Sequence, residues 1–374
     1  MSTIKYLYID DESDSSVSAT KDGFNDLKII EVFIEQPQDF ASQRAHLIKQ
    51  LSSYSGLILD YRLDGNMQLN VSYNAPAIAA ELISLMNETD ANKKIKPCPI
   101  IICSTDERMG HTYDTDKVIH ELFDYKFLKG IDPLWEKMSK KLASLAKGYD
   151  VLNEMQTKII TTILNREDLS GVNPKIFERF TDAETKLSVR DYSHFIVKEL
   201  FNHPGALVKE TLMASRLGID CFKSGDSWNE LKERFLLSAK YTGLFSDGWD
   251  RWWMDSLNSL FKAISEGRRL PSLSASERVE FLSTNTGIKG LVHAEPLPFC
   301  NSSNFWTICE ETKKPLDPLE GFRAYESIDL KPWQEQKYIS FNAIAQEGLT
   351  RKGLRPHSSE NERIKLTKEQ FAKK

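Results

Sequence analysis

YLYIDDE, at residues 6–12, is an apolar run of strand length that stops abruptly at three acids. Three later stretches also consist of a largely apolar run that ends at a polar residue: LILDYRLDG (57–65), PIIICST (99–105) and YKFLKG (125–130). Segments with helical periodicity lie between them. Buried strands that alternate with amphipathic helices are typical of a parallel sheet covered on both faces. The first part of the chain is therefore predicted to be an α/β domain.

The pattern predicts five strands and five helices in this domain, residues 1–147. The predicted strands are residues 6–9, 28–34, 56–59, 99–103 and 125–128. The predicted helices are residues 15–24, 37–52, 75–87, 116–123 and 133–146. Ligands of open α/β sheets bind beyond the carboxyl ends of the strands. The residues that follow these strands are therefore the candidate site.

Polar residues follow four of the predicted strands: Asp10 with Asp11, Asp60, Ser104 and Lys129. Clustered carboxylates raise one another's pKa unless a cation neutralises them, and Mg²⁺ prefers oxygen ligands. Asp10, Asp11 and Asp60 are thus candidate Mg²⁺ ligands. Asp60 could attack a phosphoryl group while Ser104 and Lys129 stabilise its oxygens. The alternative is structural: the acids would cap helices, and Ser104 would be a satisfied buried hydroxyl.

These residues resemble the receiver domain of bacterial two-component response regulators. The resemblance implies a flavodoxin-like fold with strand order 2-1-3-4-5 and Mg²⁺ as cofactor. It implies phosphorylation of Asp60 and places the backbone carbonyl of Arg62 among the metal ligands. It also implies a sensor histidine kinase or phosphotransfer protein as partner in a His-Asp phosphorelay.

The chain departs from the receiver pattern at three positions. Gly130 stands where proline is usual, Thr105 where a small residue is usual, and Lys126 where an aromatic switch residue is expected. Tyr125 is one position out of phase, which would place it on the other face of the strand. A degenerate receiver that acts as a protein-interaction scaffold therefore stays an alternative.

Residues 148–350 are predicted to form a mainly α-helical output or adaptor domain of unknown type. The predicted helices are residues 151–165, 192–201, 204–217, 227–242 and 249–265. The last of these would bury Trp249, Trp252 and Trp253 on one face. From residue 270 the prolines predict irregular structure, and residues 351–374 are predicted to be a mobile polar tail.

Composition limits the remaining classes of function. The 374 residues carry a net charge of −5, so nucleic acid is not an expected partner. The five cysteines are scattered and odd in number, which favours a reducing compartment. No apolar run approaches a membrane span, so no membrane partner is expected. These observations predict a cytoplasmic protein.

Taken together, the sequence predicts a response regulator in which phosphorylation of Asp60 changes what the second domain binds. An effector protein or a second copy of the chain would be its further partner. Two alternatives to the response regulator stay open. One is the scaffold described above, and the other is an effector enzyme of a stress or phage-defence system whose activity is gated by the receiver. Its active site would then lie in the second domain near Trp253, His293 or Cys300.

Overall fold

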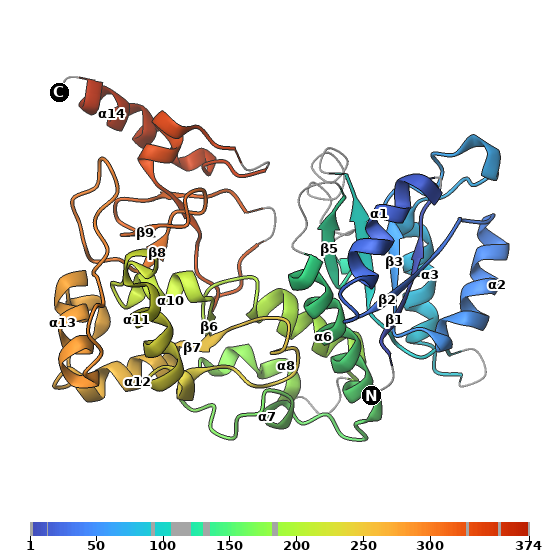
Figure 1. Cartoon of the computed structure of the whole chain (residues 1–374), viewed down its shortest axis with the longest axis horizontal. Helices are drawn as coiled ribbons and strands as arrows, with labels where there is room; N and C mark the ends of the chain where they lie inside the picture. Colours follow the sequence, from blue (N-terminus) through green and yellow to red (C-terminus); the bar gives the residue numbers. More distant parts are fainter. Residues whose placement is uncertain are drawn as a thin grey trace. The chain divides into compact units, whose positions relative to one another are not determined.

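The computed structural model describes residues 3–12, 14–90, 94–105, 121–129, 135–181, 186–326, 329–350 and 353–372. The chain forms two compact units, drawn in Figure 1. Unit 1 consists of residues 1–166, 179–199 and 243–249, and unit 2 consists of residues 167–178, 200–242 and 250–374. Each unit has a hydrophobic core of its own.

Unit 1 is built on a parallel sheet of five strands in the order β2-β1-β3-β4-β5. The strands are β1 (Lys5–Ile9), β2 (Glu31–Glu35), β3 (Gly56–Asp60), β4 (Ile100–Ser104) and β5 (Tyr125–Leu128). Every residue of β3 and β4 is buried, as expected for central strands with both faces covered. The predicted α/β sheet and its strand order are confirmed.

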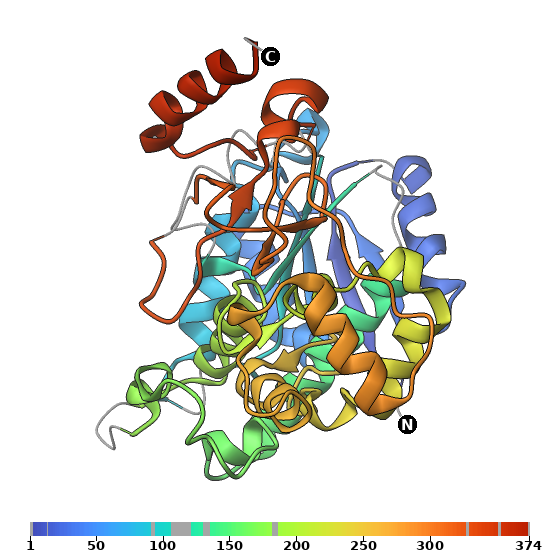
Figure 2. The ribbon, with the colours of Figure 1, turned by 90° about the vertical axis from the view of Figure 1, so that its left-hand side faces the viewer.

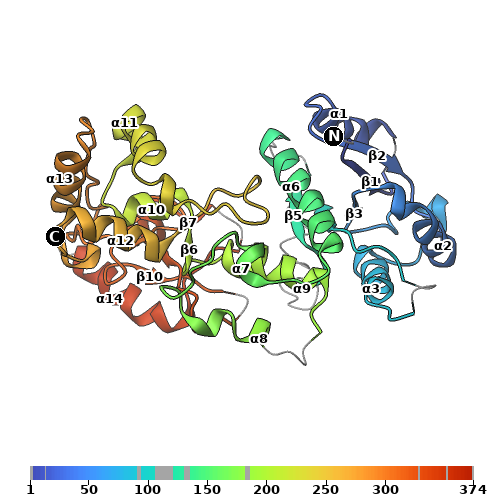
Figure 3. The same ribbon diagram turned by 90° about the horizontal axis from the view of Figure 1, so that it is seen from below.

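Helices cover both faces of this sheet, as Figure 3 shows. They are α1 (Asp14–Asn25) and α6 (Trp135–Glu154) on one face, and α2 (Phe40–Gln50) and α3 (Ala75–Met86) on the other. Helix α2 begins later than predicted because Asp39 caps it, accepting a hydrogen bond from the Ser42 backbone N–H at 3.1 Å. Most of the helix predicted at 116–123 lies outside the described residues.

Helix α6 continues beyond the predicted end at residue 146 to Glu154. It is followed by α7 (Ile160–Ile163), so the single helix predicted over 151–165 is wrong. Gly148 lies inside α6, where a Cβ would come within 2.1 Å of the Phe245 ring. This close approach lets the segment at residues 243–249 pack directly on the helix.

A buried carboxylate, Asp124, fixes the start of β5. It accepts hydrogen bonds from the Ile100 backbone N–H at 2.9 Å and the Tyr149 hydroxyl at 2.6 Å. Arg190, on α9 (Val189–His194), pairs with it at 3.0 Å. Although burial raises the pKa of Asp124, Arg190 and His194 hold it below its usual range. Asp124 therefore joins α6 and α9 to the amino ends of β4 and β5.

Replacing Arg190 by leucine is expected to lower the free energy of unfolding by about 3 kcal/mol, because it removes the arginine that pairs with the buried Asp124 carboxylate and leaves His194 as the remaining partner. Urea unfolding measures this loss. The control is Lys96→Met, which removes an exposed pair with Asp150 and is expected to cost about 1 kcal/mol or less. Equal losses in the two variants would show that the Asp124 pair does not stabilise unit 1.

Unit 2 combines helices with short antiparallel strand pairs. Its longer helices are α10 (Glu210–Arg216), α11 (Cys221–Arg234), α12 (Met254–Ile264), α13 (Ala275–Thr286) and α14 (Asn361–Ala372). The paired strands are β6 (Leu207–Val208) with β7 (Trp252–Trp253), β8 (Thr307–Ile308) with β9 (Pro315–Leu316), and β10 (Phe322–Arg323) with β11 (Tyr338–Ile339). One short helix, α8 (Glu178–Thr181), spans the boundary between the units. Helix α14, red in Figure 2, lies in the stretch expected as a polar tail.

The helix predicted at 249–265 begins only at Met254. Trp252 and Trp253 form β7, which pairs with β6, so the predicted burial of these side chains is confirmed but their helical conformation is wrong. Pairing with Leu207 and Val208 satisfies backbone groups that a helix would have satisfied internally. The helix predicted from 204 starts later, at Glu210, for the same reason.

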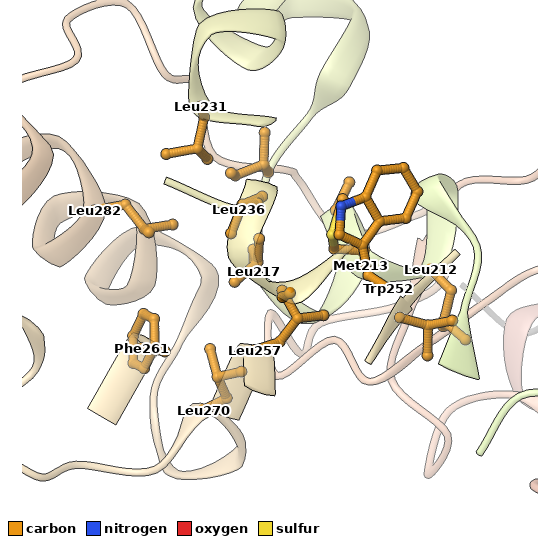
Figure 4. Close-up of a cluster of buried hydrophobic side chains, with 14 of the residues drawn as sticks. Leu212, Met213, Leu217, Leu231, Leu236, Trp252, Leu257, Phe261, Leu270 and Leu282 are labelled. Atoms are coloured by element: carbon orange, nitrogen blue, oxygen red, sulfur yellow. The ribbon is translucent and has the colours of Figure 1, made fainter. Parts of the chain in front are cut away.

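The core of unit 2 lies between α10, α11, α12 and α13. Figure 4 shows leucine side chains from these helices gathered with Met213, Phe261 and Trp252. Helix α13 was not predicted, because the prolines around it favoured irregular structure. Ser274 and Glu277 begin it with a capping box, a reciprocal pair of side-chain to backbone hydrogen bonds. No helix among the described residues is long and apolar enough to cross a membrane.

Candidate functional site

The predicted site residues meet at the carboxyl edge of the sheet in unit 1. Asp60 ends β3 and Ser104 ends β4, while Asp10 and Lys129 directly follow β1 and β5. Parallel pairing places these ends level: Asp60 pairs with Cys103, and the Lys129 backbone N–H donates to the Ser104 carbonyl at 2.8 Å. The polar ends predicted from separate strands therefore do converge.

Lys129 brings a positive charge to the carboxyl edge of the sheet. Its Nζ lies 2.6 Å from Asp10 Oδ2, 3.3 Å from Asp60 Oδ1 and 3.6 Å from Glu12 Oε1. Burial lowers the pKa of Lys129, but the carboxylates of Asp60 and Asp10 outweigh this and raise it above its ordinary value. Lys129 therefore stays charged at every physiological pH.

One lysine does not balance the carboxylates around it. Oxygens of Asp10, Asp11 and Asp60 all lie within 4.8 Å of one another, and the three residues are buried. Burial raises the pKa of Asp60 to about 7. The Lys129 ammonium lowers this pKa, whereas the carboxylates of Asp10 and Asp11 raise it further. Burial and Asp10 likewise raise the pKa of Asp11. The cluster therefore carries excess negative charge at neutral pH.

This oxygen cluster fits a hard divalent cation. Carboxylate oxygens are the ligands that Mg²⁺ prefers, and a second positive charge would lower the cost of ionising Asp60. Asp10, Asp11 and Asp60 are the residues that would hold the ion. The carbonyl of Arg62, the predicted fourth ligand, belongs to the loop after β3, and its role as a ligand stays a prediction.

Two features hold the acidic pair in place. The Tyr8 hydroxyl donates to Asp10 Oδ2, and the Glu12 backbone N–H donates to Asp10 Oδ1 at 3.0 Å. Gly65 lets its loop approach Asp11 closely, because a Cβ there would lie 2.3 Å from Asp11 Oδ2. Tyr8 was missed from the sequence, although Tyr8 and Asp10 are two apart and so share one strand face.

Ser104 places a hydroxyl at the same edge. It is fully buried, and its Oγ has no hydrogen-bond partner among the residues that the structure describes. A buried polar atom without a partner costs free energy, and such atoms often mark a ligand site. Of the departures from the receiver pattern, Thr105 is half-buried, Lys126 is exposed and Gly130 lies outside the described residues.

The residues named for an enzyme site in the second domain do not form a catalytic pair. Burial, together with Glu320, raises the pKa of the Cys300 thiol to about 12, so this thiol is a poor nucleophile at neutral pH. His293 lies 3.4 Å from Glu295, and His203 lies 3.4 Å from Glu326. Neither histidine has Cys300 as a hydrogen-bond partner among the described contacts.

No protein-family model, curated protein or solved structure matches this chain. The site must therefore be interpreted from its own geometry. It is an edge at which three buried carboxylates, one lysine and one buried hydroxyl gather beyond the ends of parallel strands.

Proposed function

We propose that unit 1 is a phospho-accepting receiver of a bacterial two-component system, and that phosphorylation of Asp60 with Mg²⁺ is its function. The observation that carries this proposal is the placement of Asp60. Its carboxylate lies among oxygens of Asp10 and Asp11 and 3.3 Å from the Lys129 ammonium. The five-stranded sheet in the order 2-1-3-4-5 supports a flavodoxin-like receiver fold.

In the proposed reaction, an Asp60 oxygen attacks phosphorus of a phosphohistidine or a small acyl phosphate. The new bond joins Asp60 to phosphorus, and the bond from phosphorus to the donor atom breaks. The donor leaves with the electron pair of that bond, as imidazole or as a carboxylate. Bound Mg²⁺ would neutralise charge on the phosphoryl oxygens.

The chain's own residues would do three things in this step. Asp10 and Asp11 hold the metal, which leaves Asp60 ionised as the nucleophile. Lys129 keeps its charge and stabilises a phosphoryl oxygen. The Ser104 hydroxyl would donate a hydrogen bond to another phosphoryl oxygen, and this would give the buried Ser104 Oγ a partner.

The partner of such a receiver is a sensor histidine kinase or a phosphotransfer protein, and unit 2 is its output module. A phosphoryl group at Asp60 would recruit Ser104 and Lys129, and so shift β4 and β5 between two arrangements. A change of a few kcal/mol is enough for such a switch. Unit 2 would then bind an effector protein, or a second copy of the chain, differently in the two states.

Beryllium fluoride tests the proposal without a kinase. It mimics a phosphoryl group by bonding to an ionised carboxylate beside Mg²⁺. We expect a bound ¹⁹F NMR signal that requires Mg²⁺ and disappears in Asp60→Asn. The matched control is Asp64→Asn, which removes an exposed acid of the neighbouring loop and is expected to keep the signal. A signal that survives in Asp60→Asn would place the acceptor elsewhere.

A further inference from the structure

A second candidate site lies in unit 2, in a surface cavity of about 380 Å³ beside the end of α12. Small-molecule sites usually have volumes of about 300 to 1,000 Å³. The wall includes three cations, Lys262, Arg268 and Arg269, together with the Trp306 ring and the polar residue Asn258. None of these residues belongs to the Asp60 site.

The sequence builds this cationic wall through the C-terminus of α12. The chain reverses there in a Schellman motif: Glu266 has a φ of +54°, and the Gly267 backbone N–H donates to the Lys262 carbonyl at 3.1 Å. The fully buried Ser265 hydroxyl then donates to the Arg268 carbonyl at 3.0 Å. The reversal brings Arg268 and Arg269 beside Lys262.

No ion pair joins these three cations to a carboxylate among the described residues, although the Arg268 guanidinium lies 5.5 Å from the Phe281 ring centroid and is near enough to Glu277 to lower the pKa of that carboxyl. Lys262 has a structural reason to be there, because a cation in the last turn stabilises the helix dipole. Arg268 and Arg269 lie beyond that turn. Their repulsion with Lys262 is relieved when an anion enters the cavity.

Trp306 adds a planar apolar wall. Its ring is half-buried, and the guanidinium of the fully buried Arg216 lies 4.4 Å from the ring centroid. Arg216 is itself held by the Trp306 carbonyl at 3.1 Å and by the Glu335 carboxylate. These contacts fix Trp306, which is the aromatic residue of the cavity wall.

A second cavity, of about 240 Å³, adjoins the first one at Asn258. Of the two acids of this second cavity, Asp255 and Glu335, the second is paired with the Arg216 guanidinium. An anionic group is thus attracted to the end of the site with Lys262, Arg268 and Arg269. Charge and shape together favour a ligand with several negative charges at one end and a planar ring at the other.

We propose that this cavity binds a nucleoside phosphate, with the phosphates against Arg268, Arg269 and Lys262 and the base against Trp306. This would give unit 2 a small-molecule ligand that is independent of the phosphoryl group at Asp60.

Isothermal titration of the full chain with ATP, and with tripolyphosphate, tests this proposal. EDTA is included so that the acidic site of unit 1 holds no metal. We expect ATP to bind, and Arg269→Glu to weaken its binding tenfold or more. The control Lys289→Glu reverses an exposed charge away from the cavity and is expected to leave the affinity unchanged.

Trp306→Leu distinguishes the contribution of the base to binding from the contribution of the phosphates. We expect it to weaken ATP binding at least fivefold and to leave tripolyphosphate binding unchanged, since only ATP has a ring to stack. The proposal is overturned if the wild-type chain does not bind ATP. It is also overturned if Arg269→Glu behaves like Lys289→Glu, or if Trp306→Leu weakens both ligands equally.

Discussion

Replacing Asp60 by asparagine is expected to make the metal-free protein more stable at pH 8. The unfolded chain ionises this carboxyl near pH 4, whereas burial delays its ionisation in the folded protein to a pKa of about 7. Between these pH values the folded state binds one proton more than the unfolded state, so its stability falls as the pH rises. Asparagine has the shape of the protonated acid and avoids this loss.

The expected gain for Asp60→Asn is on the order of 4 kcal/mol at pH 8, and close to zero at pH 4. Urea unfolding in EDTA at several pH values measures it. Asp64→Asn, in an exposed acid, is expected to show no such pH-dependent gain. With Mg²⁺ present the gain should shrink, because the ion stabilises the ionised wild-type site and loses one ligand in the variant. A stability gain over wild type that is the same at pH 4 and at pH 8 would contradict the account.

Replacing Lys129 by methionine is expected to have the opposite effect. It removes the cation that lies 2.6 Å from Asp10 and 3.3 Å from Asp60, and it leaves buried carboxylates facing one another. Breaking a buried ion pair from one side typically costs 3–5 kcal/mol, so we expect a loss of about 3 kcal/mol in metal-free buffer at pH 8.

Mg²⁺ is expected to restore part of the stability lost in Lys129→Met, because the metal replaces the missing positive charge. Lys140→Met is the control. That lysine is exposed and pairs with Glu136 one helical turn away, so its replacement is expected to change stability little and to show no Mg²⁺ rescue. If both variants lose the same stability, Lys129 is not the counter-charge of the acidic cluster.

The site could be predicted because parallel strands bring their carboxyl ends to one edge. Asp10, Asp60 and Ser104 come at the ends of buried apolar runs, and Lys129 follows the partly buried strand β5, so their convergence depends only on the sheet forming. The distances could not be predicted. That Lys129 lies nearer Asp10 than Asp60 depends on side-chain conformations that no sequence pattern contains.

Other features were missed for identifiable reasons. The capping box at Ser274 and Glu277 is a local signal for α13, whereas the prolines around it favour irregular structure. Trp252 and Trp253 fit a helical period, yet they form a strand because β6, distant in sequence, pairs with them. Such tertiary contacts override local preference.

The cavity beside α12 could not be predicted from the sequence. Its cations are spread over the helix and the turn after it, and Trp306 comes from a loop far along the chain. Nothing in their spacing indicates that they share a surface. The net charge of the chain pointed away from nucleic acid, but it averages over both units and so does not report a local group of cations.

The central claim is that Asp60 accepts a phosphoryl group, and intact mass spectrometry after incubation with acetyl phosphate tests it most directly. The account predicts that the wild-type chain gains the mass of one phosphoryl group only when Mg²⁺ is present, and that Asp60→Asn gains none. A folded wild-type chain that binds Mg²⁺ and gains no mass, or an Asp60→Asn variant that is labelled equally, would contradict it.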